Sequence, residues 1–316
     1  MERLTGLYAA PFTAFSPAGE INLEAIDLQF HALRANEIRG AIVCGTTGES
    51  SSMTTAERMS VVEEWCRVGK GGDFRIIAHV GHTSINDCIE LTRHAVATGA
   101  HVIAALPPYY FKPSKVSDLV DFFEPIAAAA GDLPFYYYHM PSFTGVDFPV
   151  MRILESLKGR IPNFAGVKYT HENLNDMARC IDYEGGRYDI LCGRDEILLP
   201  ALSLGVTGAV GSTYNYLAPV YTSLMKAFEG GDLETARRLQ GISREVIAVM
   251  VKYDGIAAAK RIMSLIGIDC GHVRTPLATL SEEQLGEMEK ELRAVGFYQH
   301  ASILPSAAAA VHTPEA

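Results

Sequence analysis

The chain has 316 residues, of which 48% are hydrophobic and 20% are charged, a composition typical of a globular enzyme. Its 37 acidic and 27 basic side chains give a formal net charge of −10, so we expect it to repel nucleic acid and anionic membranes. We exclude both as partners and expect a small-molecule ligand.

The N-terminal segment MERLTGLYAAPFTAF predicts a strand and not an export signal, because no basic stretch precedes a long apolar one and Pro11 interrupts the apolar run. No later segment approaches the roughly 18 to 20 consecutive apolar residues of a membrane span. The six cysteines are scattered without a metal-binding spacing, which is typical of reduced thiols. We therefore expect a cytoplasmic protein.

Short β-rich runs alternate with amphipathic helical stretches along the rest of the chain. The runs are GLYAAPF, GAIVCGTT, RIIAHVG, HVIAALPP, LPFYYYH, AGVKYT, DILCG and GAVGST. Eight strands alternating with helices predict an α/β fold, the TIM (β/α)8 barrel, which accommodates this length as one unit. The competing doubly wound sheet usually carries GxGxxG after its first strand, and this sequence lacks it.

Several helical stretches open with residues whose side chains can cap a first turn: Asn22, Thr54, Ser84, Ser117 and Asn173. We expect the barrel to occupy residues 1–228. Further helical patterns over 229–300 predict a C-terminal helical extension of the same unit, and the low-complexity segment 301–316 predicts a disordered tail.

The first candidate binding motif is GTTGES at 45–50, after the second strand. Gly45 and Gly48 permit a tight turn, so backbone N–H groups and the hydroxyls of Thr46 and Thr47 can converge on an anion. We expect a carboxylate there; phosphate is the alternative, although the Walker lysine is missing.

The fifth strand ends in FYYYHMP at 135–141. Consecutive aromatic residues in a strand mostly serve packing, but a phenol at the mouth of a barrel can also relay a proton. Periodicity does not choose among Tyr136, Tyr137 and Tyr138; Tyr138 lies nearest the strand end.

Lys168 stands inside the apolar run AGVKYT. Desolvating an ammonium costs several kcal/mol, and burial lowers the pKa of a lysine from about 10.4 toward neutrality, which yields an amine able to attack a ketone. Alternation places Phe164, Gly166 and Thr170 on the same face, with Gly166 leaving room beneath the amine. The alternative is a lysine that snorkels at the strand end or forms an ion pair.

Two further motifs follow the last strands. In CGRDE, Asp195 and Glu196 either satisfy the dipole of a helix N-terminus or accept hydrogen bonds from a polyol, and their charge argues against a phosphorylated substrate. In GAVGST, the backbone of Gly211 and the hydroxyl of Ser212 lie beside them. The ten histidines show no metal-ligand spacing, so a metal-dependent aldolase is disfavoured.

The ordered set GTTGES, PPYY, YYYHMPSFTGV, GVKYT, CGRDE and GSTYNYL resembles the N-acetylneuraminate lyases, from about residue 4 to residue 297. These belong to the pyruvate-dependent class I aldolases, together with dihydrodipicolinate synthase. The resemblance implies a (β/α)8 barrel, a homotetramer without metal or organic cofactor, and cleavage of N-acetylneuraminate, a sialic acid, to N-acetylmannosamine and pyruvate.

The resemblance also implies roles for single residues. Lys168 is the Schiff-base lysine, Tyr138 relays protons near the substrate C4 hydroxyl, and Thr46 and Thr47 bind the pyruvate carboxylate. The sugar-derived tail is held by Thr170, Gly193, Asp195, Glu196 and Ser212, with Gly211 neighbouring. Tyr109 or Tyr110 corresponds to a tyrosine near the site or at a subunit interface.

Three alternatives remain on the sequence. Dihydrodipicolinate synthases typically carry an arginine where this chain has Phe143, which cannot pair with a carboxylate. Another pyruvate-dependent aldolase or hydratase-aldolase would act on a different aldehyde. A catalytically silent sugar-binding barrel would form no Schiff base.

Overall fold

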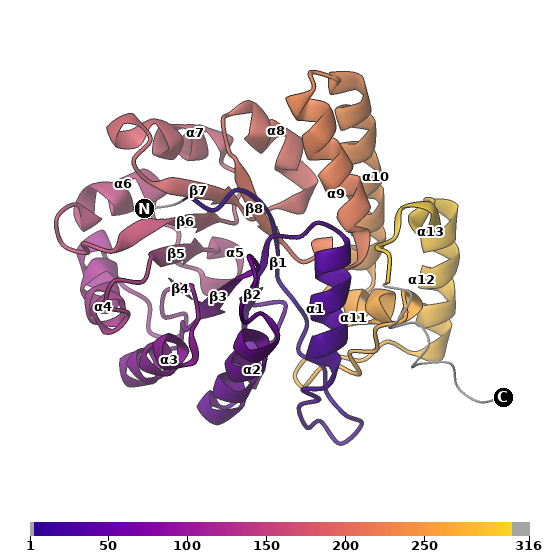
Figure 1. The fold of residues 1–316 in the computed structure, drawn as a ribbon, viewed down its shortest axis with the longest axis horizontal. Coiled ribbons are helices and arrows are strands. Elements are labelled where there is room, and N and C mark those ends of the chain that lie inside the picture. The colour runs from indigo at the N-terminus through magenta and orange to yellow at the C-terminus, as the bar shows by residue number, and fades with distance from the viewer. Residues whose placement is uncertain (1–2, 305–316) are drawn as a thin grey trace.

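The computed structural model describes residues 3–304, which are built around a closed barrel of eight strands in chain order (Figure 1). The strands coincide with the eight β-rich runs: β1 (Gly6–Ala9), β2 (Gly40–Val43), β3 (Arg75–His79), β4 (Val102–Ala105), β5 (Phe135–His139), β6 (Phe164–Tyr169), β7 (Asp189–Cys192) and β8 (Gly208–Gly211). All neighbours are parallel, and β8 pairs with β1 to close the ring. The predicted TIM barrel is confirmed.

Helices follow the strands, and most of them cover the outside of the barrel. They are α1 (Ala25–Ala35), α2 (Thr55–Val68), α3 (Ile85–Thr98), α4 (Val116–Ala129), α5 (Pro141–Thr144), α6 (Val150–Leu157), α7 (Leu174–Asp182), α8 (Leu198–Ser203) and α9 (Tyr214–Glu229), with short 3-10 segments η1 (Ser50–Ser52), η2 (Tyr183–Gly185) and η3 (Asp195–Ile197). Strands and helices bury one large apolar cluster between them. A smaller cluster, which includes Tyr8, Ile42, Ile77 and Tyr136, fills the barrel interior.

Three of the five predicted capping residues are confirmed. The side chains of Thr54, Ser84 and Asn173 each accept a hydrogen bond from the backbone N–H three residues later. The other two predictions are wrong, because Asn22 lies ahead of the start of α1 and Ser117 falls inside the first turn of α4.

Simple alternation fails at the start of β6. The pairing with β5 shifts register between Phe135 and Tyr136, as at a bulge, and Phe164 packs against Phe135 on the helix side instead of sharing a face with Lys168. Gly166 makes room for the neighbouring strand and for a ring, and not for the amine, since a Cβ there would collide with the carbonyl oxygen of Asp189 and lie 2.8 Å from Tyr136 Cε1.

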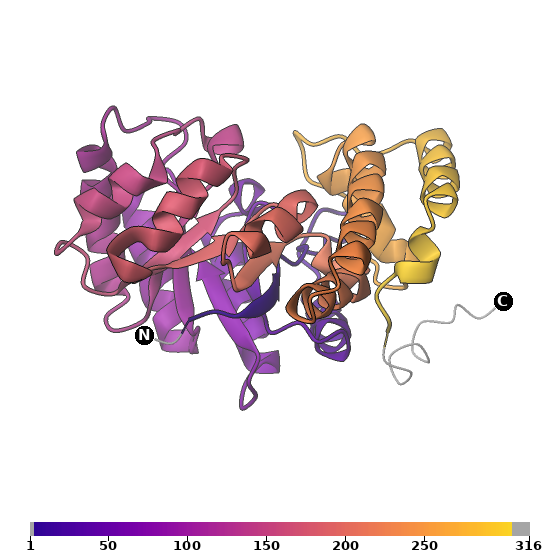
Figure 2. The same ribbon diagram turned by 90° about the horizontal axis from the view of Figure 1, so that it is seen from above.

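The C-terminal helices stand beside the barrel next to α9 (Figures 1 and 2). They are α10 (Leu233–Lys252), α11 (Ile256–Leu265), α12 (Glu282–Ala294) and α13 (Phe297–His300). None of the helices within the described residues is long and apolar enough to cross a membrane. All six cysteines are buried free thiols, as expected.

The first four residues of the tail predicted at 301–316 are ordered. Ser302 donates its backbone N–H to the carbonyl of Tyr216 at 2.8 Å, and its hydroxyl accepts from the N–H of Ala218 at 3.1 Å. Residues 301–304 are thereby tied to α9. The remainder of the predicted tail, 305–316, lies outside the described residues.

Candidate active site

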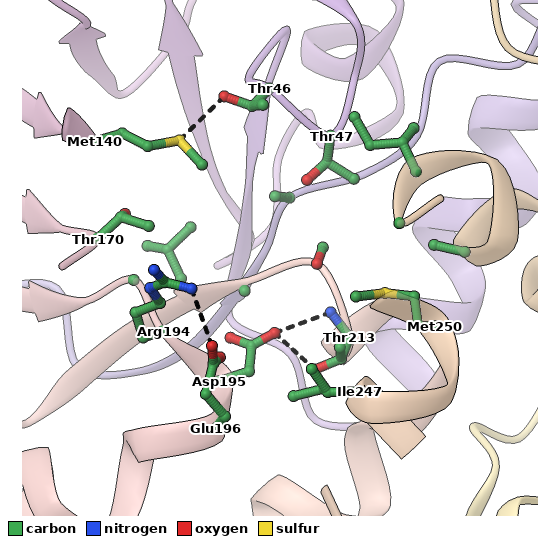
Figure 3. Close-up of a pocket in the computed structure, with 18 of the residues that line it drawn as sticks. Thr46, Thr47, Met140, Thr170, Arg194, Asp195, Glu196, Thr213, Ile247 and Met250 are labelled. Atoms are coloured by element: carbon green, nitrogen blue, oxygen red, sulfur yellow. Dashed lines mark hydrogen bonds and ion pairs between the residues drawn. The ribbon is translucent and has the colours of Figure 1, made fainter. Parts of the chain in front are cut away.

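At the C-terminal mouth of the barrel, the strand ends surround a cavity of about 400 Å³ (Figure 3). All ten residues predicted for the site line this cavity: Lys168, Tyr138, Thr46, Thr47, Thr170, Gly193, Asp195, Glu196, Gly211 and Ser212. They come from the ends of five strands and the loops that follow them. Closure of the barrel therefore gathers them on the face where enzymes of this fold carry their active sites.

Lys168 points into the cavity from the end of β6. It is 5% exposed, and no carboxylate within residues 3–304 forms an ion pair with it. Its Nζ lies 3.9 Å from the centre of the Tyr138 ring on the neighbouring strand, a distance typical of a cation–π contact. The snorkelling and ion-pair interpretations are therefore wrong, and the amine is available to a ligand.

The three consecutive tyrosines face different parts of the protein. Tyr136 reaches into the barrel interior, where its hydroxyl donates to Asp189 Oδ2 at 2.8 Å. Tyr137 faces the helices and packs against Phe123. Tyr138 is the member of the three that lines the cavity. Of the three tyrosines, Tyr138 is therefore the candidate for the proton relay, a choice that periodicity left open.

The hydroxyl of Tyr138 has two partners in the cavity. It lies 3.3 Å from Thr46 Oγ1 and donates to Met140 Sδ at 3.1 Å. Thr46 also donates to the same sulfur, at 3.4 Å. A thioether is a weak acceptor, so a ligand oxygen can replace it as the partner of Tyr138.

A histidine that the motifs did not single out supports Tyr138 from below. The ring of His79 meets the Tyr138 ring edge-on, with 5.7 Å between centres. Its Nε2 accepts from the N–H of Leu106, so Nδ1 carries the proton and donates to the carbonyl of Cys44 at 2.8 Å. Burial lowers the pKa of His79 to about 3, and the ring is a fixed, neutral support at physiological pH.

The GTTGES turn is held by a hydrogen bond and contains one residue with an unusual backbone conformation. Thr13 Oγ1 donates to the carbonyl of Gly48 at 2.7 Å. Glu49 has φ of 54°, in the left-handed region that few residues other than glycine adopt. The anchored turn places Thr46 and Thr47, both half-buried, in the cavity wall.

Asp195 lies across the cavity from this turn (Figure 3). Its Oδ2 accepts from the N–H and the hydroxyl of Thr213, at 3.1 and 2.6 Å. Burial raises the pKa of Asp195 to about 6, although the hydrogen bonds from Thr213 oppose the shift. Its Oδ1 has no hydrogen-bond partner among the described residues and lies against Gly211, where a Cβ would collide with it.

Thr170 and Gly193 repeat this arrangement. The Thr170 hydroxyl is buried without a partner in the described part of the chain, and a Cβ at Gly193 would collide with it. Unpaired buried polar groups are rare in folded proteins. With Arg194 Nε, three such atoms belong to residues that line this cavity, which indicates a ligand with several hydrogen-bonding groups.

The acidic loop also contains a basic residue, Arg194. Arg194 pairs with Glu196 at 3.0 Å and with Glu172 on the other side. The positive charge of Arg194 therefore partly offsets the negative charge of Glu196 at the cavity wall. Arg194 forms no such ion pair with Asp195. Asp195 and Glu196 also lie in the first turn of η3 just before α8, as the helix-terminus interpretation expects, and their role in binding stays a prediction.

One wall of the cavity was not predicted. It is apolar and comes from the C-terminal helices, with Ile247, Met250, Val251, Ile256 and Ala259. These residues follow an ordinary amphipathic pattern, so the sequence does not distinguish them from helix core. Within residues 3–304, no group of three or more His, Cys, Asp and Glu side chains could hold a metal ion.

Comparison with known proteins gives a consistent assignment. The model of the dihydrodipicolinate synthetase family matches residues 3–295. The N-acetylneuraminate lyase of Gallus gallus is 40% identical over 298 residues, which cover 93% of this chain and 97% of that protein.

Solved structures agree with this. The N-acetylneuraminate lyase of Aliivibrio salmonicida has a TM-score of 0.91 and 39% identity, covering 95% of this chain and all of that one. The N-acetylneuraminate lyase of Proteus mirabilis has a TM-score of 0.89 and 38% identity, covering 94% and 100%.

Proposed function

Because this chain belongs to the dihydrodipicolinate synthetase family, we propose that it is an N-acetylneuraminate lyase that cleaves its substrate through an imine on Lys168. The observation that carries the proposal is the buried amine of Lys168, without a counter-ion and facing Tyr138 in the cavity. Similarity to N-acetylneuraminate lyases over nearly the whole chain supports the choice of substrate.

In the proposed reaction, the open-chain sugar acid binds with its carboxylate at Thr46 and Thr47. The free amine of Lys168 attacks the C2 ketone, and loss of water gives an iminium that can accept an electron pair.

Cleavage then follows at C3–C4. Tyr138 passes its phenol proton to the substrate carboxylate as it takes the proton of the C4 hydroxyl, the C4 oxygen becomes an aldehyde, and the electrons of the C3–C4 bond move into the iminium to form an enamine. N-acetylmannosamine leaves. Protonation of the enamine at C3 and hydrolysis of the iminium release pyruvate and regenerate Lys168, with no metal or organic cofactor in any step.

The polar side of the cavity suits the polyhydroxyl tail. The unpaired Thr170 hydroxyl and Asp195 Oδ1, together with Glu196 and the backbone at Gly193, provide acceptors and donors for several hydroxyl groups, with Ser212 and Gly211 beside them. A dihydrodipicolinate synthase needs a cation for its second carboxylate. Phe143, 67% exposed in the cavity lining, offers none.

The test is a product assay with three substrates. The proposal expects pyruvate and N-acetylmannosamine from N-acetylneuraminate, and no condensation of pyruvate with aspartate semialdehyde. Turnover of the semialdehyde, or of other sugar-acid ketones in place of N-acetylneuraminate, would assign the chain to another aldolase. No turnover of any would favour the silent sugar-binding barrel.

We further propose that the protein is a cytoplasmic homotetramer. Beside the resemblance, the support for an assembly is a pair of exposed aromatic rings after β4, Tyr110 at 76% and Phe111 at 86% exposure. Large exposed apolar side chains grouped in this way often mark a protein interface.

A further inference from the structure

A chain of polar side chains begins at the carboxylate of Asp195 and runs away from the cavity into α9 and α10. Thr213 Oγ1 lies 2.6 Å from Asp195 Oδ2 and 2.6 Å from the hydroxyl of Tyr221. The Tyr221 hydroxyl is 2.9 Å from Ser243 Oγ. Gln240 donates to Ser243 Oγ at 3.2 Å and to the backbone carbonyl of Asp195 at 3.0 Å, so the chain returns to the residue where it began.

The four side chains behind Asp195 are sealed from solvent. Thr213 is 1% exposed, Gln240 2%, and both Tyr221 and Ser243 0%. Apolar side chains could fill the same space without the cost of burying polar groups. The function of this network therefore lies at the Asp195 carboxylate, which is the end of the network that faces the cavity.

The bond to the carboxylate has a fixed direction. A carboxylate only accepts, so the Thr213 hydroxyl donates to Asp195 Oδ2. The Thr213 hydroxyl is also oriented as a donor toward the Tyr221 oxygen, the hydroxyls of Tyr221 and Ser243 share a hydrogen bond, and Gln240 donates to Ser243. The network thus ends in a charge-assisted bond to Asp195, which holds Oδ2 in place.

We propose that Thr213, Tyr221, Ser243 and Gln240 are positioning residues that hold Asp195 as a fixed acceptor for the hydroxyl groups of the aldehyde half of the substrate. This rests on the proposed function, in which the pyruvate half lies at Lys168. Oδ2 already takes two hydrogen bonds from Thr213. Oδ1 makes no hydrogen bond within the described residues and is the oxygen that retains accepting capacity, although the buried hydroxyl of Tyr214 lies close to the same carboxylate.

The experiment uses the condensation direction, in which pyruvate and N-acetylmannosamine have separate KM values. Thr213→Val removes the hydroxyl at nearly constant volume. The KM for N-acetylmannosamine should rise between about 10- and 100-fold, the effect of losing a hydrogen bond to a charged group. The KM for pyruvate, and borohydride trapping of pyruvate on Lys168, should not change.

Two matched variants separate positioning from a general loss of structure. Thr213→Ser restores the hydroxyl and should bring the KM for N-acetylmannosamine back toward the wild-type value. Thr222→Val makes the same substitution on α9, but the Thr222 hydroxyl donates only to the helix carbonyls of Ala218 and Pro219. It should alter neither KM.

Ser243→Ala interrupts the chain further from the cavity and should raise the same KM by a smaller factor; it replaces Thr213→Val if that variant does not fold. An unchanged KM for N-acetylmannosamine, or an equal rise in both KM values, would overturn the proposal. A wild-type protein that traps no pyruvate or consumes no N-acetylmannosamine would instead refute the proposed function, before any variant is compared.

Discussion

Tyr138 combines a fixed ring with a loosely held hydroxyl. The ring lies between the amine of Lys168 and the edge of His79, whereas the hydroxyl has only Thr46 and the weakly accepting sulfur of Met140 as partners. Such an arrangement keeps the phenol in place and leaves its proton free to exchange with a substrate oxygen.

Tyr138→Phe should therefore lower kcat by about 10²- to 10⁴-fold, the usual contribution of a general acid–base group. The imine with pyruvate should still form, because that step uses Lys168. Steady-state kinetics and borohydride trapping measure the two effects. Tyr137→Phe is the control, since that ring faces the helices, and a comparable loss of kcat in this variant would contradict the assigned role.

The raised pKa of Asp195 predicts that activity falls at acidic pH. Burial raises its pKa to about 6, with Glu196 raising it further and Thr213 and Lys168 lowering it. If the charged form accepts substrate hydroxyls, kcat/KM for cleavage should fall as the pH drops through about 6, because protonation converts an acceptor into a donor. In Asp195→Asn this step should disappear from the pH profile. If kcat/KM of Asp195→Asn still falls as the pH drops through about 6, the titrating group is a residue other than Asp195.

At the scale of elements, a buried ion pair ties the GTTGES turn to the C-terminal helices. Glu49, at the end of the turn, lies 2.6 Å from Lys260 of α11, and both side chains are 2% exposed or less. Lys260 also donates to the carbonyl of His272 and lies over the ring of Phe15. The turn that carries Thr46 and Thr47 is thus positioned by a helix distant in the sequence.

Lys260→Met should lower the free energy of unfolding by about 3–5 kcal/mol, because it removes the ion-pair partner of the buried Glu49 carboxylate and leaves it only the backbone N–H of Arg274. Combining it with Glu49→Gln should recover part of this loss. The control is Lys226→Met, which breaks an exposed pair with Glu37 and should cost less than about 1 kcal/mol. Equal effects of Lys260→Met and Lys226→Met in urea unfolding would contradict this account.

The sequence predicted the strands better than the details of the helices. Each strand is a compact β-rich run, whereas the start of a helix depends on one or two residues. The predictions that Asn22 and Ser117 cap helices were wrong for that reason. The register shift in β6 left no sign in the sequence, because strand alternation assumes regular pairing. It changed the face of Phe164 but not that of Lys168.

For the whole molecule, the (β/α)8 architecture was predictable because it repeats one pattern eight times and requires strand ends to meet at one mouth. This is also why all ten predicted site residues line one cavity. The apolar wall with Ile247 and Met250 was not predictable, since it depends on how the C-terminal helices pack. The closed hydrogen-bond network behind Asp195 likewise joins segments that no local pattern connects.

The proposed homotetramer makes a prediction for the molecule as a whole. Light scattering should give the mass of four 34.3 kDa chains. Phe111→Asp, which places a charge on the exposed rings after β4, should shift the population toward smaller species, because burying an unpaired charge at an interface is unfavourable. A monomeric wild-type protein would refute the assembly, and an unchanged tetramer in the variant would place its interfaces elsewhere.

The most direct test of the central claim is chemical trapping at Lys168. Incubation with pyruvate and sodium borohydride, followed by peptide mass spectrometry, should find one pyruvate-derived group reduced onto Lys168. The modification should be absent in Lys168→Arg, whose guanidinium stays protonated and forms no imine. An unmodified Lys168, or an adduct on another lysine, would contradict the proposed mechanism.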